Sequence, residues 1–300
     1  MDMREVFLAT VADALDDDPR LAVVLADISA AQLADAAGRH PDRVVNLGIR
    51  EQLLVSVGGG LALTGMRPVL HSFGPFLVER PFEQVKLDLG HQNVGAVLVS
   101  YGGSYDMPGA GRTHQSPGDV ALLDTLPGWT IHVPGHPDEA RSLLLDALPG
   151  DNPVYLRLSG QTNTEAFPTG EVHVPRRGSS GVVLAVGPVL DAVLAATEHA
   201  DVTVLYTATA RPFPARALHA AVRQTGRADV LVVEPYHVGT SAHAVSEALA
   251  DIPHRLRSVG VRRQSELRVY GSPADHDAAH GLDAAGIAVA LHRLTHPQPD

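Results

Sequence analysis

The first feature of this sequence that could take part in chemistry is a carboxyl group at the start of an apolar helix. Glu51 follows Gly48 and precedes the run 53–62, in which Ser56 is the only polar side chain. A carboxylate in the first turn of a helix is ordinarily a cap or a partner for the helix dipole, a contribution of about 0.3–1 kcal/mol. Because so apolar a helix is expected to be buried on most sides, Glu51 should border a dry layer. Taken alone, Glu51 is compatible with both capping and function.

Two further segments carry side chains that could contact a ligand. Residues 73–84 follow a predicted strand and place aromatic rings and Arg80 in the first turns of the next predicted helix. Such rings either cover a flat ligand or fill an ordinary core. The glycine-rich loop 109–117 presents His114 at the edge where a parallel sheet binds ligands. A single histidine is also compatible with a structural role.

Other motifs in the sequence do not indicate a functional site. The glycines at 58–60 lie inside a predicted helix and do not form a G-x-G-x-x-G phosphate loop, so they indicate close packing. Residues 102–106 lack the last glycine of the G-x-S-x-G elbow that carries a catalytic serine, and there is no Walker motif. His276 and His280 have the spacing of a helical metal site, but a solvated surface patch is the better expectation.

Composition narrows the class of protein. The chain has 300 residues, 45% of them hydrophobic, which is ample for two domains or one large α/β domain. Its net charge of −11 argues against binding to nucleic acid or anionic membranes. The absence of cysteine excludes thiol catalysis, and Lys86 is the only lysine, which leaves almost no room for Schiff-base chemistry.

The chain shows no targeting signal. Its N-terminus is charged, with no apolar run behind it. The longest apolar run, 53–66, falls short of the ~20 residues needed to span a membrane. We therefore expect a cytoplasmic protein.

The elements that must position these residues alternate between strands and helices. Strands are predicted at 21–26, 68–73, 95–100, 129–133 and 154–158, and helices at 5–15, 51–62, 76–89, 119–126 and 137–148. A second alternation runs from 182 to 249. This pattern predicts an α/β protein with two doubly wound parallel sheets. We expect a domain at 1–170, a linker at 171–181 rich in Pro, Gly and Ser, and a smaller domain at 182–300.

The order and spacing of three motifs resemble one family closely. They are Gly48-Ile49-Arg50-Glu51, the aromatic segment F-x-x-F-x-x-x-R-x-F-E-Q at 73–84, and Thr113-His114-Gln115. Together they resemble the C-terminal half of a transketolase, in which a pyrimidine-binding domain is followed by a small C-terminal domain. The resemblance covers nearly the whole chain and includes Asp27-Ile28 and Val233-Glu234-Pro235-Tyr236-His237.

The resemblance implies a thiamine diphosphate enzyme that transfers a two-carbon ketol unit. By similarity, Glu51 shares a proton with the pyrimidine ring of the cofactor, a role that a dry pocket strengthens. Phe76 lies under that ring, and Phe73 and Arg80 shape its pocket. Further roles implied by similarity are a subunit contact beside the cofactor for Asp27, hydrogen bonds to substrate oxygens for His114, and a substrate contact for Arg4. Arg112, where this chain departs from the family pattern, is a further candidate for contact with substrate.

One part of the family's site is missing. Transketolases hold diphosphate and Mg²⁺ with a Gly-Asp-Gly motif followed by an asparagine. The nearest matches, 118–120 and 150–152, fail at the third position and lie in the wrong domain. The resemblance therefore implies that a separate subunit carries this motif and holds most of the Mg²⁺ site. An α2β2 assembly of a split transketolase is the expected form.

Departures from the family pattern bear on the substrate. Ala110-Gly111-Arg112 replaces the usual Asp-Gly-Pro, and Ser159-Gly160-Gln161 replaces Ser-Arg-Gln, whose arginine grips the substrate phosphate. Loss of such an arginine costs about 1.5–3 kcal/mol of phosphate recognition. We therefore expect a donor unlike the ordinary pentose phosphates.

Two alternatives to a split transketolase remain, the β subunit of a 2-oxo-acid dehydrogenase and a non-catalytic assembly subunit of the same fold.

Overall fold

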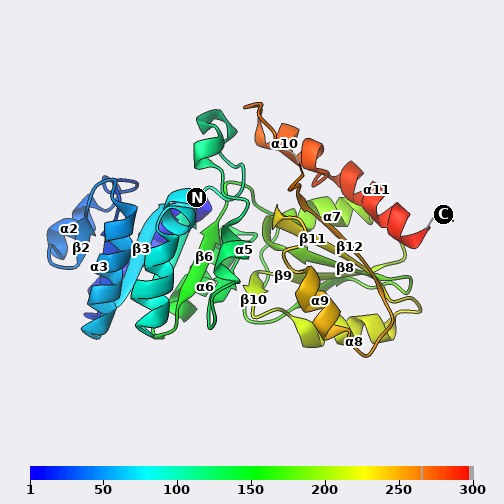
Figure 1. Cartoon of the computed structure of the whole chain (residues 1–300), viewed down its shortest axis with the longest axis horizontal. Coiled ribbons are helices and arrows are strands. Elements are labelled where there is room, and N and C mark those ends of the chain that lie inside the picture. Colours follow the sequence, from blue (N-terminus) through cyan, green and yellow to red (C-terminus); the bar gives the residue numbers. More distant parts are fainter. Residues whose placement is uncertain (265, 297–300) are drawn as a thin grey trace.

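Two parallel sheets, each covered by helices on both faces, form the chain in a computed structural model that describes residues 1–264 and 266–296 (Figure 1). The first sheet has the strand order β2-β1-β3-β4-β6-β5-β10, in which only β10 is antiparallel to its neighbour. Its strands are β1 (Leu21–Leu25), β2 (Val44–Asn46), β3 (Arg67–Phe73), β4 (Val97–Tyr101), β5 (Thr130–His132), β6 (Val154–Leu158) and β10 (Thr209–Arg211).

Helices cover the two faces of the first sheet separately. One buried cluster joins α1 and α6 to one face, and another joins α3, α5 and two π-helical segments to the other. These elements are α1 (Met3–Asp17), α2 (Ala34–Arg39), α3 (Glu51–Leu63), η1 (Pro75–Glu79), α4 (Phe82–Gln84), η2 (Val85–His91), α5 (Asp119–Leu123) and α6 (Pro137–Ala147). Continuous apolar runs such as Leu21–Leu25 are buried at every position, as expected for strands covered on both faces.

The second sheet has the order β12-β11-β8-β9-β7, with β7 antiparallel to β9. Its strands are β7 (His173–Arg176), β8 (Val182–Val186), β9 (Thr203–Thr207), β11 (Asp229–His237) and β12 (Arg255–Val261). The helices around it are α7 (Leu190–Ala196), α8 (Ala215–Gln224), α9 (Ala242–Ala248), α10 (Pro273–His280) and α11 (Ala284–Thr295). The predicted α/β class with two parallel-dominated sheets is confirmed.

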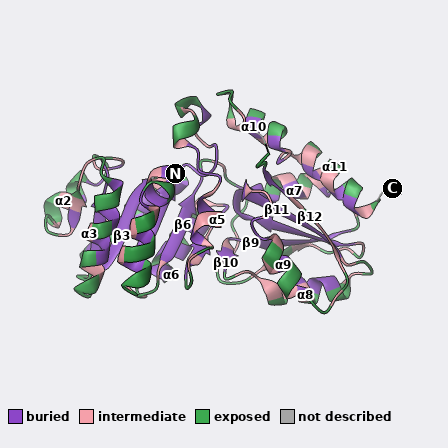
Figure 2. Ribbon diagram, in the orientation of Figure 1, coloured by how far each residue is buried: buried purple, intermediate pink, exposed green. Residues whose placement is uncertain are grey.

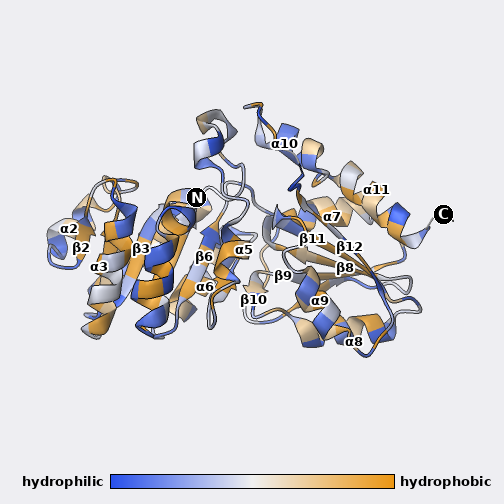
Figure 3. Cartoon of the chain, viewed as in Figure 1, coloured by the Kyte–Doolittle hydropathy of each residue, from blue (hydrophilic) through white to orange (hydrophobic). Residues whose placement is uncertain are grey.

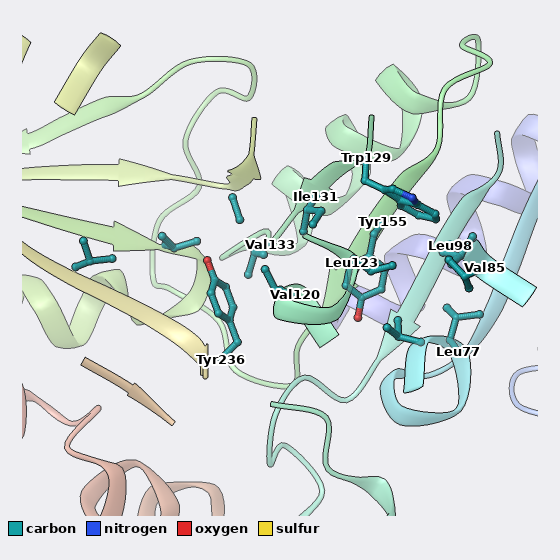
Figure 4. Packing of buried hydrophobic residues seen from close by; sticks show 14 of the residues in the cluster. Leu77, Val85, Leu98, Val120, Leu123, Trp129, Ile131, Val133, Tyr155 and Tyr236 are labelled. Carbon is teal, nitrogen blue, oxygen red and sulfur yellow. The ribbon is translucent and has the colours of Figure 1, made fainter. Parts of the chain in front are cut away.

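The two sheets share one hydrophobic core. Ile131 and Val133 of the first sheet lie in the same buried cluster as Val186 and Tyr236 of the second, and Figure 4 shows several of these side chains between the two. The strand β10 comes from the second half of the chain yet pairs with β5. The interval 171–181, expected to be a linker, contributes the edge strand β7. The strand β10 thus ties the two halves together through backbone hydrogen bonds, whereas β7 pairs within the second sheet.

The helix α3 is packed closely by its glycines. A Cβ atom on Gly58 would come within 2.7 Å of the Leu70 side chain, and one on Gly59 within 2.6 Å of the Asp88 carbonyl oxygen. Gly60 instead faces open space. Close packing thus explains two of the three glycines. Figure 2 shows the outer face of α3 exposed, and Figure 3 shows hydrophobic residues along β3 and parts of α3.

The helix expected at 76–89 is wound differently. It consists of the π-helical turn η1, the short α4 and the π-helical segment η2. The amide of Arg80 bonds to the carbonyl of Pro75, five residues back. Pro81 follows and has no N–H to continue an α-helical ladder, which accounts for the wide turn. This winding sets the direction of the aromatic and arginine side chains on the segment.

Candidate active site

The functional residues predicted from the sequence leave the carboxyl ends of adjacent strands. The chain passes from β1 to β2 on one side and then to β3 on the other, so a topological switch point lies beside β1. Asp27 follows β1, Glu51 follows β2, Phe76 follows β3 and His114 follows β4. Open α/β sheets bind ligands at such a position.

Glu51 is buried and paired through one oxygen. Its exposed fraction is 1%, and its Oε2 accepts a hydrogen bond of 2.6 Å from Nη1 of Arg80. The Arg80 guanidinium lies over the Phe76 ring, 4.0 Å from its centroid. Within the described part of the chain, no group donates a hydrogen bond to Oε1 of Glu51. Oε1 is therefore open to a hydrogen-bond donor from another molecule.

An aromatic cluster adjoins this carboxylate. The rings of Phe73 and Phe76 meet edge to face, with centroids 6.1 Å apart. The imidazole of His114 packs edge-on against both, 5.4 Å from Phe73 and 5.0 Å from Phe76. The three rings are half-buried, so they retain surface for another contact. The structure therefore brings the three sequence motifs together.

Asp27 lies beside the turn that leads to Glu51. Its backbone has a positive φ of 66°, and its amide donates to Oδ1 of Asn46 at 3.0 Å. The side-chain amide of Asn46 donates back to Asp27, and the amide of Gly48 also donates to Asn46. Asn46, which was not among the residues predicted from the sequence, therefore fixes the position of Asp27 relative to the turn before α3. Its place just before Gly48 in the motif was the available signal.

Arg4 lies near the aromatic cluster, whereas Arg112 points elsewhere. The Arg4 guanidinium stacks on Tyr101, 4.6 Å from the ring centroid, and Tyr101 contacts Phe73. The buried Nε of Arg4 has no hydrogen-bond partner in the described structure. Arg112 donates to Glu266 at 2.6 Å and to the carbonyl of Gln115 at 2.9 Å. Its guanidinium is therefore held by the second half of the chain.

A buried polar network supports the loop that carries His114. Arg157 and Asp119, both almost fully buried, form an ion pair of 2.7 Å. Tyr155 also donates to Asp119, and Arg157 donates to Ser104 at the base of the loop. The Ser104 hydroxyl in turn donates to the Pro235 carbonyl of β11. An arginine inside the buried strand 154–158 was the sequence signal for this network, because such a charge needs a partner.

A second carboxylate, Asp106, lies in the same loop. Its oxygens accept hydrogen bonds from the Ser159 hydroxyl at 2.9 Å and the Gly160 amide at 2.8 Å. Burial raises the pKa of Asp106 to about 6, although these donors and Arg157 oppose the shift. The Asp106 carboxyl group therefore lies next to Gly160, the residue that stands where the family pattern has the arginine of Ser-Arg-Gln.

The preferred prediction for His276 and His280 was wrong. Their exposed fractions are 1% and 9%, so they do not form a solvated surface patch. Both rings stack on Tyr105, which donates through its hydroxyl to Asp277. Only the docking of α10 onto the loop after β4 buries them. They form no metal site either, because the described residues contain no cluster of three or more potential metal-ligating side chains.

The described residues also contain no helix long and apolar enough to cross a membrane.

The fold and the arrangement of these residues define a class: a doubly wound α/β protein with a candidate ligand site at a switch point. Residues 1–164 match the model of the transketolase pyrimidine-binding domain, and the chain belongs to that family. The expected transketolase resemblance is thereby confirmed.

Relatives and a solved structure agree with this family. The chain is 55% identical to an uncharacterized 33.6 kDa protein in the fasciation locus of Rhodococcoides fascians, over 97% of this chain and 94% of the relative. It is 30% identical to one subunit of the apulose-4-phosphate transketolase of Actinobacillus succinogenes, over 95% of this chain and 94% of the relative. A solved structure described as a split gene transketolase, inactive beta4 tetramer, superposes with a TM-score of 0.84 at 25% identity and covers 98% of both chains.

Proposed function

We propose that this chain is the smaller subunit of a split, thiamine diphosphate-dependent transketolase and supplies half of each active site. The observation that carries the proposal is the buried Glu51 carboxylate, whose Oε1 has no donor among the described residues and which adjoins the cluster of Phe73, Phe76 and His114. Support also comes from the family match and from relatives named as subunits of transketolases.

The residues present fit the pyrimidine half of the cofactor. Oε1 of Glu51 could share a proton with a ring nitrogen, and the half-buried Phe76 offers a flat apolar surface. Thiamine diphosphate, when bound, supplies the carbanion-stabilising centre for two-carbon transfer. Arg80 holds the carboxylate from the other side, so Glu51 has one orientation before any ligand arrives.

The remaining predicted residues have positions suited to substrate. His114 would donate to or accept from oxygens of the bound substrate, because its ring borders the same aromatic cluster. The unpartnered Nε of Arg4 could donate to an anionic or hydroxyl group. Asp27, at the turn before α3, would act in the subunit contact beside the cofactor. Arg112 would have to leave Glu266 before it could contact substrate.

A partner subunit would supply the diphosphate and Mg²⁺ half of the site. Asp119, in the incomplete motif at 118–120, is fully buried and accepts hydrogen bonds from Arg157 and Tyr155, so it is not free to ligate a metal. The partner would carry the Gly-Asp-Gly motif, and two copies of each chain would form an α2β2 enzyme in the cytoplasm. The 2-oxo-acid dehydrogenase β subunit and the non-catalytic subunit are the competing proposals.

Reconstitution with a candidate partner chain that carries the Gly-Asp-Gly motif is the decisive experiment. The complex should bind thiamine diphosphate with Mg²⁺ and transfer a ketol unit to an aldehyde, whereas this chain alone should show no micromolar binding. Pyruvate decarboxylation in place of ketol transfer would favour the dehydrogenase alternative. Assembly without either activity, across a panel of ketose and 2-oxo donors, would favour the non-catalytic subunit. Tight cofactor binding by the isolated chain would contradict the split site.

A further inference from the structure

A second cavity lies between the two halves of the chain, behind the loop that carries His114. Its volume is about 340 Å³, within the range of small-molecule sites. Arg112 and Gln115 line it from the loop after β4, and His237, Arg262 and Arg263 line it from the ends of β11 and β12. His114 is not among its lining residues; its ring packs on Phe73 and Phe76 instead. This cavity is called the arginine cleft below.

The arginine cleft is positively charged in a chain whose net charge is −11. Three guanidinium groups line it, from Arg112, Arg262 and Arg263, against the single carboxylate of Glu266. Burial lowers the pKa of His280 to about 4, with nearby positive groups adding to the shift, and burial also lowers the pKa of His237. Both histidines are therefore mainly neutral near neutral pH, and the arginines set the charge of the cleft.

The arginines retain donors for a ligand. Arg262 donates from its backbone amide to the His280 ring, whereas its guanidinium makes no hydrogen bond or ion pair with another described residue. Arg263 donates from Nε to the Val238 carbonyl and from Nη2 to Thr240, which orients its guanidinium and leaves Nη1 without an acceptor among the described residues. Arg112 is engaged by Glu266, but both side chains are about half exposed. Exposed pairs of this kind contribute roughly 0–1 kcal/mol, so an anion could displace Glu266 at little cost.

We propose that the arginine cleft binds a small dianion that carries a phosphoryl group. Guanidinium groups from three positions on two separate elements suit the several oxygens of a tetrahedral anion better than one planar carboxylate. The volume accommodates inorganic phosphate or a small phosphate monoester. Because Arg112 and Gln115 flank His114 on both sides, a bound anion also acts on the loop that positions this histidine. The proposal does not depend on the cofactor or on a partner subunit.

Calorimetric titration of the full chain with inorganic phosphate near neutral pH, at constant ionic strength in chloride, tests the site. We expect saturable binding with a Kd below about 1 mM. The double variant Arg262→Gln/Arg263→Gln should weaken binding about tenfold or more, since it removes two of the three charges. Arg257→Gln is the matched control, because this exposed arginine lies on β12, just before Arg262 and Arg263, but does not line the cleft. It should change the Kd less than about twofold.

Glu266→Gln provides a test in the opposite direction. Because it removes the competing carboxylate and releases Arg112, phosphate binding should tighten about threefold or more. This surface substitution is expected to leave the fold intact, so the test survives if the double arginine variant fails to fold. Absence of saturable binding up to about 10 mM phosphate would overturn the proposal. Equal weakening by Arg257→Gln, or no tightening by Glu266→Gln, would overturn it as well.

Discussion

The edge site around Glu51 and the network around Arg157 use the same kinds of residue in opposite ways. At Arg157 the ionised groups have partners: Asp119 accepts hydrogen bonds from both Arg157 and Tyr155. Arg157 also donates to Ser104, whose hydroxyl donates to the Pro235 carbonyl. At the edge site, Oε1 of Glu51 and Nε of Arg4 have no partner in the described structure. A saturated network stabilises a fold, whereas polar atoms held ready beside half-exposed rings serve a ligand.

The largest predicted effect is on the saturated network. Arg157→Leu should lower the free energy of unfolding by about 3–5 kcal/mol, because it leaves Asp119 as an uncompensated buried charge. Chemical denaturation followed by circular dichroism measures this change. The double variant Arg157→Leu/Asp119→Leu should recover part of the loss. A single variant as stable as the wild type would show that the pair does not support the fold.

Substitution of Glu51 should reduce activity and leave stability largely unchanged. Glu51→Gln preserves shape but removes the acid, so ketol transfer by the reconstituted enzyme should fall by about 100-fold or more. The free energy of unfolding should stay within about 1 kcal/mol of wild type or rise, as for other functional groups that are not optimised for stability. Steady-state kinetics and denaturation on the same preparation test both halves of the prediction. Full activity would remove Glu51 from the proposed mechanism.

A third buried carboxyl group lies between these extremes. The side chain of Glu234 is buried, and burial raises its pKa to about 7, although the neighbouring Ser241, Thr240 and Arg211 oppose the shift. The folded state binds the Glu234 proton more tightly than the unfolded state does. The contribution of this proton to the free energy of unfolding is therefore complete at low pH and is lost as pH rises. The window runs from about 4.5 to about 7 and amounts to at most about 3 kcal/mol.

Glu234→Gln tests this contribution. The variant cannot titrate, so its free energy of unfolding should fall less than that of wild type between about pH 4.5 and pH 7. Denaturant titrations across this range supply the comparison. Parallel curves for the two proteins would mean that Glu234 is ionised or paired in the folded state.

The smallest effect on stability is expected at Arg80, which pairs with Glu51 at the edge of the sheet. Arg80→Met keeps the aliphatic contact with Phe76 but leaves Glu51 without its donor. Because the arginine side chain is 37% exposed, the loss of stability should be only about 1 kcal/mol. Thermal denaturation detects it. The larger consequence should be in the affinity of the reconstituted enzyme for cofactor, and a variant unchanged in both would separate Arg80 from the site.

The sequence predicted that most of the candidate site residues would lie together, because they are found at the ends of neighbouring strands. Phe73 is the last residue of β3. Glu51, Phe76 and His114 each follow a strand, and parallel strands place their carboxyl ends together. The π-helical winding before Arg80 was not predicted, since apolar spacing cannot distinguish neighbouring helical periods over so short a segment. The burial of His276 and His280 was missed because α10 looks like an ordinary polar surface helix until it docks on Tyr105.

By itself, the sequence determined the alternation of strands and helices, the family, and the edge of the sheet at which the candidate residues lie. These depend on periodicity and on the order of motifs, which are local properties of the chain. Only the tertiary structure decided which charges meet: Arg80 with Glu51, Arg157 with Asp119, and Arg112 with Glu266. Each pair joins residues far apart in sequence, and which atoms remain unpaired for a ligand depends on how the sheets and loops pack. No local pattern encodes that outcome.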